Sequence, residues 1–203
     1  MIDFPIISSL ILLPSIGALF LFFTRSNKEN NFTVKYVALF TSIVNFILSI
    51  YLWILFDQTT SDFQFVEDRV WIENFINYKV GIDGISILFI LLTTFITPLC
   101  IISVNNSIKT RLGEFLIAIL IMESFMIGVF CSLDLVVFYL FFEAGLIPMF
   151  LIIGIWGGNR RVYSAFKFFL YTLLGSVLML VAIISIYWIT GTTDVVKLYD
   201  YGI

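Results

Sequence analysis

Hydrophobic residues along the chain fall into six long, almost uninterrupted runs that are separated by polar segments. The runs cover residues 6–23, 36–56, 85–102, 115–131, 133–154 and 165–189. A helix needs roughly 20 apolar residues to cross a bilayer, and only helices or closed barrels satisfy their backbone hydrogen bonds within lipid. The pattern therefore predicts six transmembrane helices, with a very tight turn around Ser132 between the fourth and the fifth.

The composition agrees with a membrane protein. Hydrophobic residues make up 61% of the chain and charged residues 12%, whereas soluble domains are ~45–50% apolar and ~25% charged. We interpret residues 1–203 as a single all-α polytopic membrane domain. The first run has no basic segment before it and no small-residue cleavage site after it, so we expect a retained span and not a secretory signal.

The segments that join the runs alternate in charge. Segments 23–36, 103–114 and 155–164 are net basic, whereas the start of the chain, the loop between the second and third runs, and the tail are acidic. Because Lys and Arg favour the cytoplasmic or matrix side, both termini are predicted on the opposite side. We expect the long acidic loop, residues 57–79, to pack over that outer surface, with a short hairpin as one form it could take.

Several kinds of site are excluded by residue usage. The chain has no His, which excludes His-ligated metal sites and haem, and no glycine-rich phosphate loop follows a strand pattern. Cys100 and Cys131 lie at predicted span ends, where packing residues are a better interpretation than a disulfide or metal pair. We expect no metal, no nucleotide and no nucleic-acid partner.

Glu143 is an acid in the middle of an apolar run, about ten residues from either end. A charge near the bilayer midplane costs at least roughly 2.5–3.5 kcal/mol, so intramembrane acids usually carry protons or ions. Pro148 follows five residues later and frees a backbone carbonyl near Ala144, which loosens the helix beside the acid. We interpret Glu143 as the strongest candidate for proton or ion transport.

Glu123 lies in the preceding run, at a similar predicted depth because the two helices are antiparallel neighbours. If Glu123 and Glu143 both face inward, two carboxyl groups share one region of low dielectric constant, and at least one of them is expected to bind a proton. The alternative for Glu123 is a structural one, in which it stays protonated and hydrogen-bonds a neighbouring helix. The sequence leaves the two interpretations open.

Lys167 belongs to a polar stripe on the sixth run. The stripe has helical spacing and contains Ser164, Lys167, Tyr171, Thr172, Gly175, Ser176 and Met179. Lys167 lies about one turn inside the basic surface, where it could extend its ammonium group to the headgroups or serve as the cationic partner of an acid. Gly175 and Ser176 are better interpreted as helix-packing residues.

Together these residues resemble a known family. The segments 134–149, 155–160 and 165–179, which contain Glu143, Pro148 and Lys167, are similar to subunit 4 of respiratory complex I, the proton-pumping NADH:quinone oxidoreductase, called chain M in bacteria. The segment from Gly81 to Ser86 and the residues around Glu123 also fit. The resemblance covers about residues 80 to 190, and its motifs are specific.

The resemblance implies that the six helices are the first part of a longer antiporter-like bundle. In the family, the acid that Glu143 matches pairs with a Lys on a broken seventh helix, which this sequence does not contain. The remaining helices are then expected on a separate chain from a split gene, or the sequence is a fragment of a longer one.

The resemblance also implies a function. Quinone reduction elsewhere in the complex would drive proton transport through this subunit, with Glu143 as the switching acid and Glu123 and Lys167 as further candidates on the proton path. No redox site or cofactor is expected in this chain, apart from bound phospholipid such as cardiolipin. The expected partners are other membrane-arm subunits and the lipid bilayer, in the mitochondrial inner membrane or a bacterial plasma membrane, with both termini on the proton-receiving side.

Two alternatives remain at this point. One is a subunit of a multi-subunit sodium/proton antiporter, and the other is a structural element of the membrane arm that does not pump.

Overall fold

The computed structural model describes residues 5–24, 31–72, 76–104, 108 and 110–200. Six long helices lie within this part of the chain: α1 (Ile6–Thr24), α2 (Asn31–Leu55), α3 (Ser86–Ser103), α4 (Leu112–Cys131), α5 (Leu135–Trp156) and α6 (Arg161–Thr190). Each is long and apolar enough to cross a membrane. The six predicted spans are confirmed, although α2 begins at residue 31 and not 36, and α6 at residue 161 and not 165.

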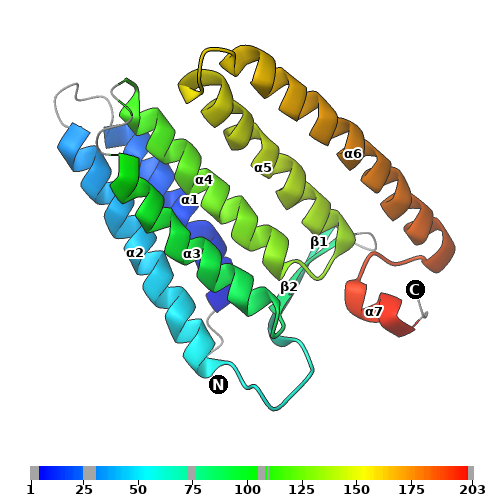
Figure 1. Cartoon of the computed structure of the whole chain (residues 1–203). Coiled ribbons are helices and arrows are strands. Elements are labelled where there is room, and N and C mark those ends of the chain that lie inside the picture. Colours follow the sequence, from blue (N-terminus) through cyan, green and yellow to red (C-terminus); the bar gives the residue numbers. More distant parts are fainter. Residues whose placement is uncertain (1–4, 25–30, 73–75, 105–107, 109, 201–203) are drawn as a thin grey trace.

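The helices lie side by side, and α1 to α4 form the packed part of the bundle (Figure 1). Two clusters of buried side chains fill this part, one toward each end. The first cluster contains Ile7, Leu10, Leu52, Ile90 and Ile127, and the second contains Ala18, Leu21, Ile101, Leu116 and Leu120. The core of the described chain is therefore the contact region of the first four helices.

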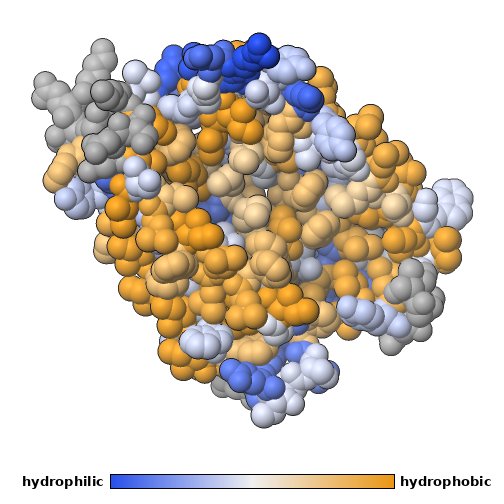
Figure 2. All heavy atoms as spheres, in the orientation of Figure 1, coloured by the Kyte–Doolittle hydropathy of each residue, from blue (hydrophilic) through white to orange (hydrophobic). Residues whose placement is uncertain are grey.

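α5 packs beside α4, and α6 lies beyond α5 as the outermost helix (Figure 1). Many large hydrophobic side chains of α6 are exposed, among them Leu170, Leu174 and Leu178. Figure 2 shows a broad hydrophobic belt between hydrophilic regions at the two ends of the bundle. Such a belt is what a helix bundle embedded in hydrocarbon requires.

The loop between α2 and α3 forms an antiparallel hairpin of β1 (Gln64–Ile72) and β2 (Ile76–Ile82). Val80 and Ile82 of β2 are fully buried in the first core cluster. On β1, Glu67 Oε1 accepts hydrogen bonds from the backbone amides of Ile7 (2.9 Å) and Ser8 (3.2 Å), at the start of α1. The hairpin thus packs on one end of the bundle, which confirms the expectation that this loop covers the surface.

The start of α1 and the end of α6 both lie at the hairpin end of the bundle (Figure 1). The short helix α7 (Val195–Asp200) is found there too, and the sequence pattern did not indicate it. Arg111, Arg160 and Arg161 precede or begin α4 and α6, and therefore lie at the opposite end. The other basic side chains of the segments predicted on this side include Arg25, Lys28 and Lys109, which lie outside the described residues.

Candidate functional site

The site is built around α5, and Asp134 fixes where this helix begins. One carboxylate oxygen of Asp134 accepts hydrogen bonds from the backbone amides of Val136 (2.8 Å) and Val137 (3.2 Å), which would otherwise lack partners in the first helical turn. The other oxygen accepts a hydrogen bond from the Thr193 hydroxyl at 2.5 Å. The N-cap of α5 is therefore also a contact with the segment that follows α6.

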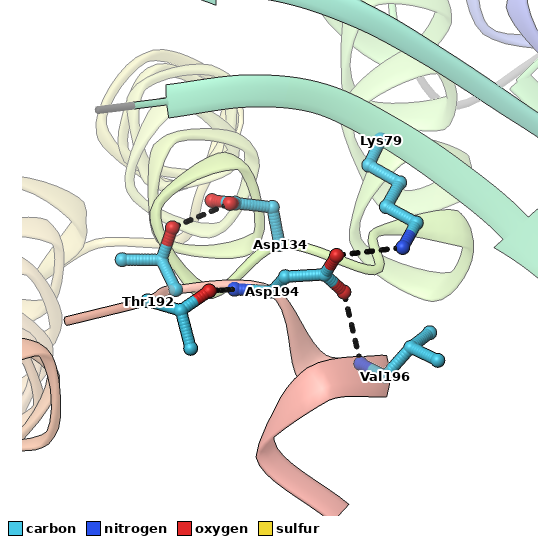
Figure 3. Close-up of polar contacts among 6 residues, drawn as sticks. Lys79, Asp134, Thr192, Asp194 and Val196 are labelled. Carbon is cyan, nitrogen blue, oxygen red and sulfur yellow. Dashed lines mark hydrogen bonds and ion pairs between the residues drawn. The ribbon is translucent and has the colours of Figure 1, made fainter. Parts of the chain in front are cut away.

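Backbone hydrogen bonds join three segments at this point. The Leu133 amide donates to the Lys79 carbonyl, the Leu135 amide to the Thr193 carbonyl, and the Val195 amide to the Leu133 carbonyl, each at 2.9 Å. Lys79 Nζ also lies 2.7 Å from Asp194 Oδ2 (Figure 3). We call residues 79–80, 132–135 and 192–196 the junction, because they tie β2, the α4–α5 turn and the α6–α7 segment together.

The turn between α4 and α5 is as tight as the sequence predicts: α4 ends at Cys131 and α5 begins at Leu135. Just before the turn, a Cβ atom on Gly128 would lie 2.6 Å from the ring of Phe141, so only glycine permits this close approach. Further along, the rings of Phe125 and Phe141 are 6.4 Å apart. Close packing around Phe141 therefore fixes α5 against α4 in the turn that leads to Glu143.

Glu143 lies eight residues into α5, about 12 Å along the helix axis from Leu135. Its side chain is half-buried, and its Oε2 atom is fully buried without a hydrogen-bond partner in the described part of the chain. Spacings of three and four place Glu143 on the same face as Leu146 and Phe150. Because the Phe150 ring contacts Phe166 and Phe169 at 5.5 and 5.3 Å, this is the face that α5 turns toward α6.

Pro148 lies inside α5, one turn beyond the acid, and is buried. Proline has no amide hydrogen, so it cannot donate to the carbonyl of Ala144. The helix beside Glu143 therefore lacks one of its regular hydrogen bonds, as the sequence predicts.

Lys167 on α6 is exposed and forms no ion pair with any described residue. Phe166 and Phe169, which flank Lys167 in the sequence, both contact Phe150 of α5. Lys167 therefore lies at the level of Phe150. Phe150 is seven residues from Glu143, so Lys167 is displaced from the acid by about 10 Å along the helices. The structure does not bring these two candidate residues together.

Glu123 on α4 lies within about one helical turn of Glu143 in depth, but its carboxyl group faces α2. A Cβ atom on Gly145 would lie 3.8 Å from Phe125. Because α4 and α5 are antiparallel, Glu123 is then level with residue 147, about 6 Å along the axis from Glu143, which agrees with the similar depth that the sequence predicts. The Glu123 carboxyl, however, is 1% exposed and accepts a hydrogen bond from Nδ2 of Asn45 on α2 at 2.9 Å. The two acids therefore face different helices and do not share one polar region.

Asn45 is a site residue that the sequence analysis missed. It belongs to a buried polar row on α2 with spacings of three and four, formed by Ser42, Asn45 and Ser49. Ser49 lies within hydrogen-bond distance, 2.7 Å, of the Thr94 hydroxyl on α3. Polar residues at this spacing within an otherwise apolar run are the signal that could have identified the row.

A cleft of about 780 Å³ lies between α1, the hairpin, α4 and α5. Its lining includes Ala144 and Phe141 of α5 and Arg69, Trp71 and Tyr78 of the hairpin. Burial raises the pKa of the Tyr78 hydroxyl, which lies 3.2 Å from the Ser8 hydroxyl. The cleft is lined mostly by apolar side chains and adjoins α5 at the level of Glu143.

The described chain is a bundle of six membrane-spanning helices that contains two acids, Glu123 with an amide partner and Glu143 with one oxygen unpaired. Residues 132–202 match the family model described as NADH:quinone oxidoreductase/Mrp antiporter, TM. The chain is 59% identical over 167 residues to NADH-quinone oxidoreductase subunit M of Rhodobacter capsulatus, covering 82% of the chain and 32% of that protein. It is 48% identical over 190 residues to NADH-ubiquinone oxidoreductase chain 4 of Marchantia polymorpha, covering 93% of the chain and 38% of that protein.

Solved structures show the same fold. A chain of respiratory complex I from Thermus thermophilus, solved with bound NADH, is 27% identical with a TM-score of 0.77, covering 93% of this chain and 38% of that one. A chain of the archaeal membrane-bound sulfane sulfur reductase has a TM-score of 0.79 at 17% identity, covering 94% of this chain and 39% of that one, which is a likeness of fold.

The chain is thus homologous to subunit M, or chain 4, of NADH:quinone oxidoreductases. It spans less than two fifths of the length of these relatives, and the partial coverage fits their N-terminal portion.

Proposed function

We propose that this chain is the N-terminal portion of a proton-translocating membrane-arm subunit of NADH:quinone oxidoreductase, in which Glu143 is the acid that changes its protonation state. The observation that carries the proposal is the buried Oε2 atom of Glu143, which has no hydrogen-bond partner within the described residues. A carboxyl group at mid-membrane depth is unfavourable as an isolated anion. Its ionised form becomes favourable only when a cation or hydrogen-bond donor approaches.

Such a partner would come from outside the described chain. Lys167 is too far along α6 to be that cation, and we place it near the basic end of the bundle, where its ammonium group reaches the headgroup region. The remaining part of the subunit, on the same or a separate chain, is then the source of the partner of Glu143. Approach and withdrawal of this partner would release and take up a proton.

Three observations fit Glu143 for this role. The junction and the Gly128–Phe141 contact hold the start of α5, so the acid has a fixed position. Pro148 removes a backbone hydrogen bond next to it, which lets the second half of α5 move more easily. The exposed surface of α6 leaves room on that side of the bundle for further helices.

We further propose that redox chemistry belongs to other subunits, and that neighbouring membrane-arm subunits and bilayer lipid surround this one. The basic ends of α4 and α6 would face the cytoplasm or matrix, and both termini the proton-receiving side. The membrane is a bacterial plasma membrane or a mitochondrial inner membrane.

A sodium/proton antiporter subunit is the second candidate, because the matching family model includes both kinds of protein. Purification of the assembled complex distinguishes them: flavin and iron–sulfur subunits accompany the chain only if it belongs to an oxidoreductase.

The test is NADH-driven proton pumping by membrane vesicles, normalised to the amount of assembled complex. Glu143→Gln keeps the volume and hydrogen-bonding capacity of the side chain but cannot ionise, so we expect pumping to be lost while the complex still assembles. Glu143→Asp retains an acid and should preserve part of the activity. The exposed acid Asp62 offers a control in Asp62→Asn, which should pump normally. Normal pumping by an assembled Glu143→Gln complex would refute the proposal.

A further inference from the structure

The hydrogen bonding around Glu123 is incomplete in a particular way. Asn45 Nδ2 donates to Glu123 Oε1 at 2.9 Å, but Oε2 of Glu123 and Oδ1 of Asn45 are both fully buried without a partner in the described chain. Both of these atoms are acceptors when Glu123 is ionised. An ionised pair would therefore bury two unsatisfied acceptors next to each other, which is strongly unfavourable.

The surrounding side chains do not supply the missing donor. The Ser42 hydroxyl donates to the Leu39 carbonyl at 3.0 Å, and the Ser124 hydroxyl donates to the Ile11 carbonyl. Among the buried polar side chains described on α1 to α4, Glu123 is the only one that can carry a charge, and no described cation pairs with it. An anionic Glu123 would thus have one hydrogen bond and no counter-charge in a low-dielectric environment.

We propose that Glu123 holds a proton on Oε2 and donates it to Oδ1 of Asn45, so that the two side chains close into an acid–amide pair with two hydrogen bonds. A single proton then satisfies both unpartnered atoms. The terminal torsions of Glu and Asn are broad, so the two end groups can rotate to close the second bond. The pair is neutral and ties α2 to α4 near the middle of the bundle.

The proposal gives the two intramembrane acids different roles. Glu123 finds its complementary group, Asn45, within the described chain, whereas the unpartnered oxygen of Glu143 has no such acceptor there. Glu123 therefore keeps its proton during turnover, and Asn45 is its positioning residue. This inference is independent of the proposed function of Glu143.

Infrared spectroscopy of the purified complex tests the protonation state directly. A protonated carboxylic acid absorbs in a region separate from carboxylates and amides, so the wild-type minus Glu123→Gln spectrum should show a protonated-acid band at neutral pH. Asn45→Leu should shift this band, because the acid loses its amide partner. If the difference spectrum shows a carboxylate band and no protonated-acid band, the proposal is overturned; a bound cation in place of the proton would give the same result.

Paired variants test the geometry. Gln at position 123 can form the same two hydrogen bonds with Asn45, so Glu123→Gln should assemble and pump like the wild type. Asn45→Asp places a second acid beside Glu123 and removes the amide donor, so we expect a loss of assembled complex. The double variant Asn45→Asp with Glu123→Gln exchanges acid and amide at constant side-chain length, and should restore assembly.

Two outcomes contradict the pair. One is a double variant that assembles no better than Asn45→Asp alone, and the other is an assembled Glu123→Gln complex that does not pump. Normal pumping by Glu143→Gln would contradict the proposed function but not the acid–amide pair. The two proposals can therefore be refuted independently.

Discussion

Lys79 on β2 and Asp194 after α6 are 115 positions apart in the sequence, and their charged groups are 2.7 Å apart in the structure. Their side chains are only 13% and 12% exposed. The pair lies beside Asp134, the N-cap of α5 (Figure 3). A contact between two connecting segments thus helps to fix the helix that carries Glu143.

Removing one partner of this ion pair should destabilise the hairpin end of the bundle. Lys79→Met leaves a mostly buried carboxylate without its cation, and we expect a loss of about 1.5–3 kcal/mol, the usual range for a hydrogen bond to a charged group. Thermal unfolding of the purified complex measures it. Arg111→Asn is the control, because the Arg111–Glu114 pair is 4.0 Å long with Arg111 64% exposed, and exposed pairs contribute about 0–1 kcal/mol. Equal effects of both variants would contradict the junction's importance.

Gly128 should not tolerate a side chain. In Gly128→Ala the new methyl group would lie 2.6 Å from the Phe141 ring, and forced overpacking typically costs about 1–3 kcal/mol. Phe141→Leu should partly rescue assembly in the double variant. Gly84→Ala, in the turn before α3, is the matched control, since a Cβ atom added there would meet no atom of the described chain within 4 Å. The measurement is the yield and melting temperature of the complex; a Gly128→Ala complex as stable as Gly84→Ala would contradict the packing.

Asp83 should make α3 sensitive to acid. Burial acts to raise the pKa of Asp83, but hydrogen bonds from Ser86 outweigh it, and the pKa is lowered below its ordinary value. The Ser86 amide donates to Asp83 Oδ1 at 2.7 Å, and the Asp83 amide donates to the Ser86 hydroxyl at 2.8 Å. Because the folded pKa is below the unfolded one, this stabilisation is present above the unfolded pKa and is lost as pH falls through the folded pKa.

The corresponding experiment compares the pH dependence of unfolding for the wild type and Asp83→Asn. The variant should be less stable at neutral pH, and the difference should shrink in acid as Asp83 of the wild type becomes protonated. A difference that stays constant across the titration would show that the charge of Asp83 has no part in it.

Glu67 should stabilise the start of α1 from a distance of 60 residues along the chain. Glu67→Ala removes the acceptor for the Ile7 and Ser8 amides, and loss of a helix cap costs about 0.5–2 kcal/mol. Hydrogen exchange of these two amides should become faster, with little change at Val136 and Val137, which Asp134 caps. Unchanged exchange at Ile7 and Ser8 would contradict the capping role.

The sequence predicts the membrane fold well because hydrophobic length is a local property. Six spans, the tight turn at Ser132, and the similar depth of Glu123 and Glu143 all follow from counting residues along helices. The length and acidic composition of the loop between the second and third spans can also be read locally, and they predict that it covers one end of the bundle. These features do not depend on which helix contacts which.

Contacts across the sequence are not predictable in the same way. Depth alone did not show that Glu123 turns toward Asn45 on α2, because facing depends on the order of helices around α4. The ion pair of Lys79 with Asp194 joins two connecting segments, and in the sequence their charges indicate only the side of the membrane on which each segment lies. Lys167 lies on the predicted polar stripe of α6. Its distance from Glu143 along the helices depends on how α6 packs beside α5, which the contacts of Phe150 with Phe166 and Phe169 show. This helix-to-helix alignment cannot be read from either sequence segment alone.

The three hydrogen bonds of Leu133, Leu135 and Val195 at the junction use main-chain groups only. These hydrogen bonds themselves depend on the backbone and not on side-chain identity, although the buried Leu133 must also keep an apolar side chain. A one-residue deletion between Thr190 and Val195 is different, because it shifts an extended segment by about 3.3 Å and reverses which side chains face inward. Chimaeras with related subunits should therefore preserve the residue spacing at the junction as strictly as its charged side chains, because the backbone contacts depend on spacing alone.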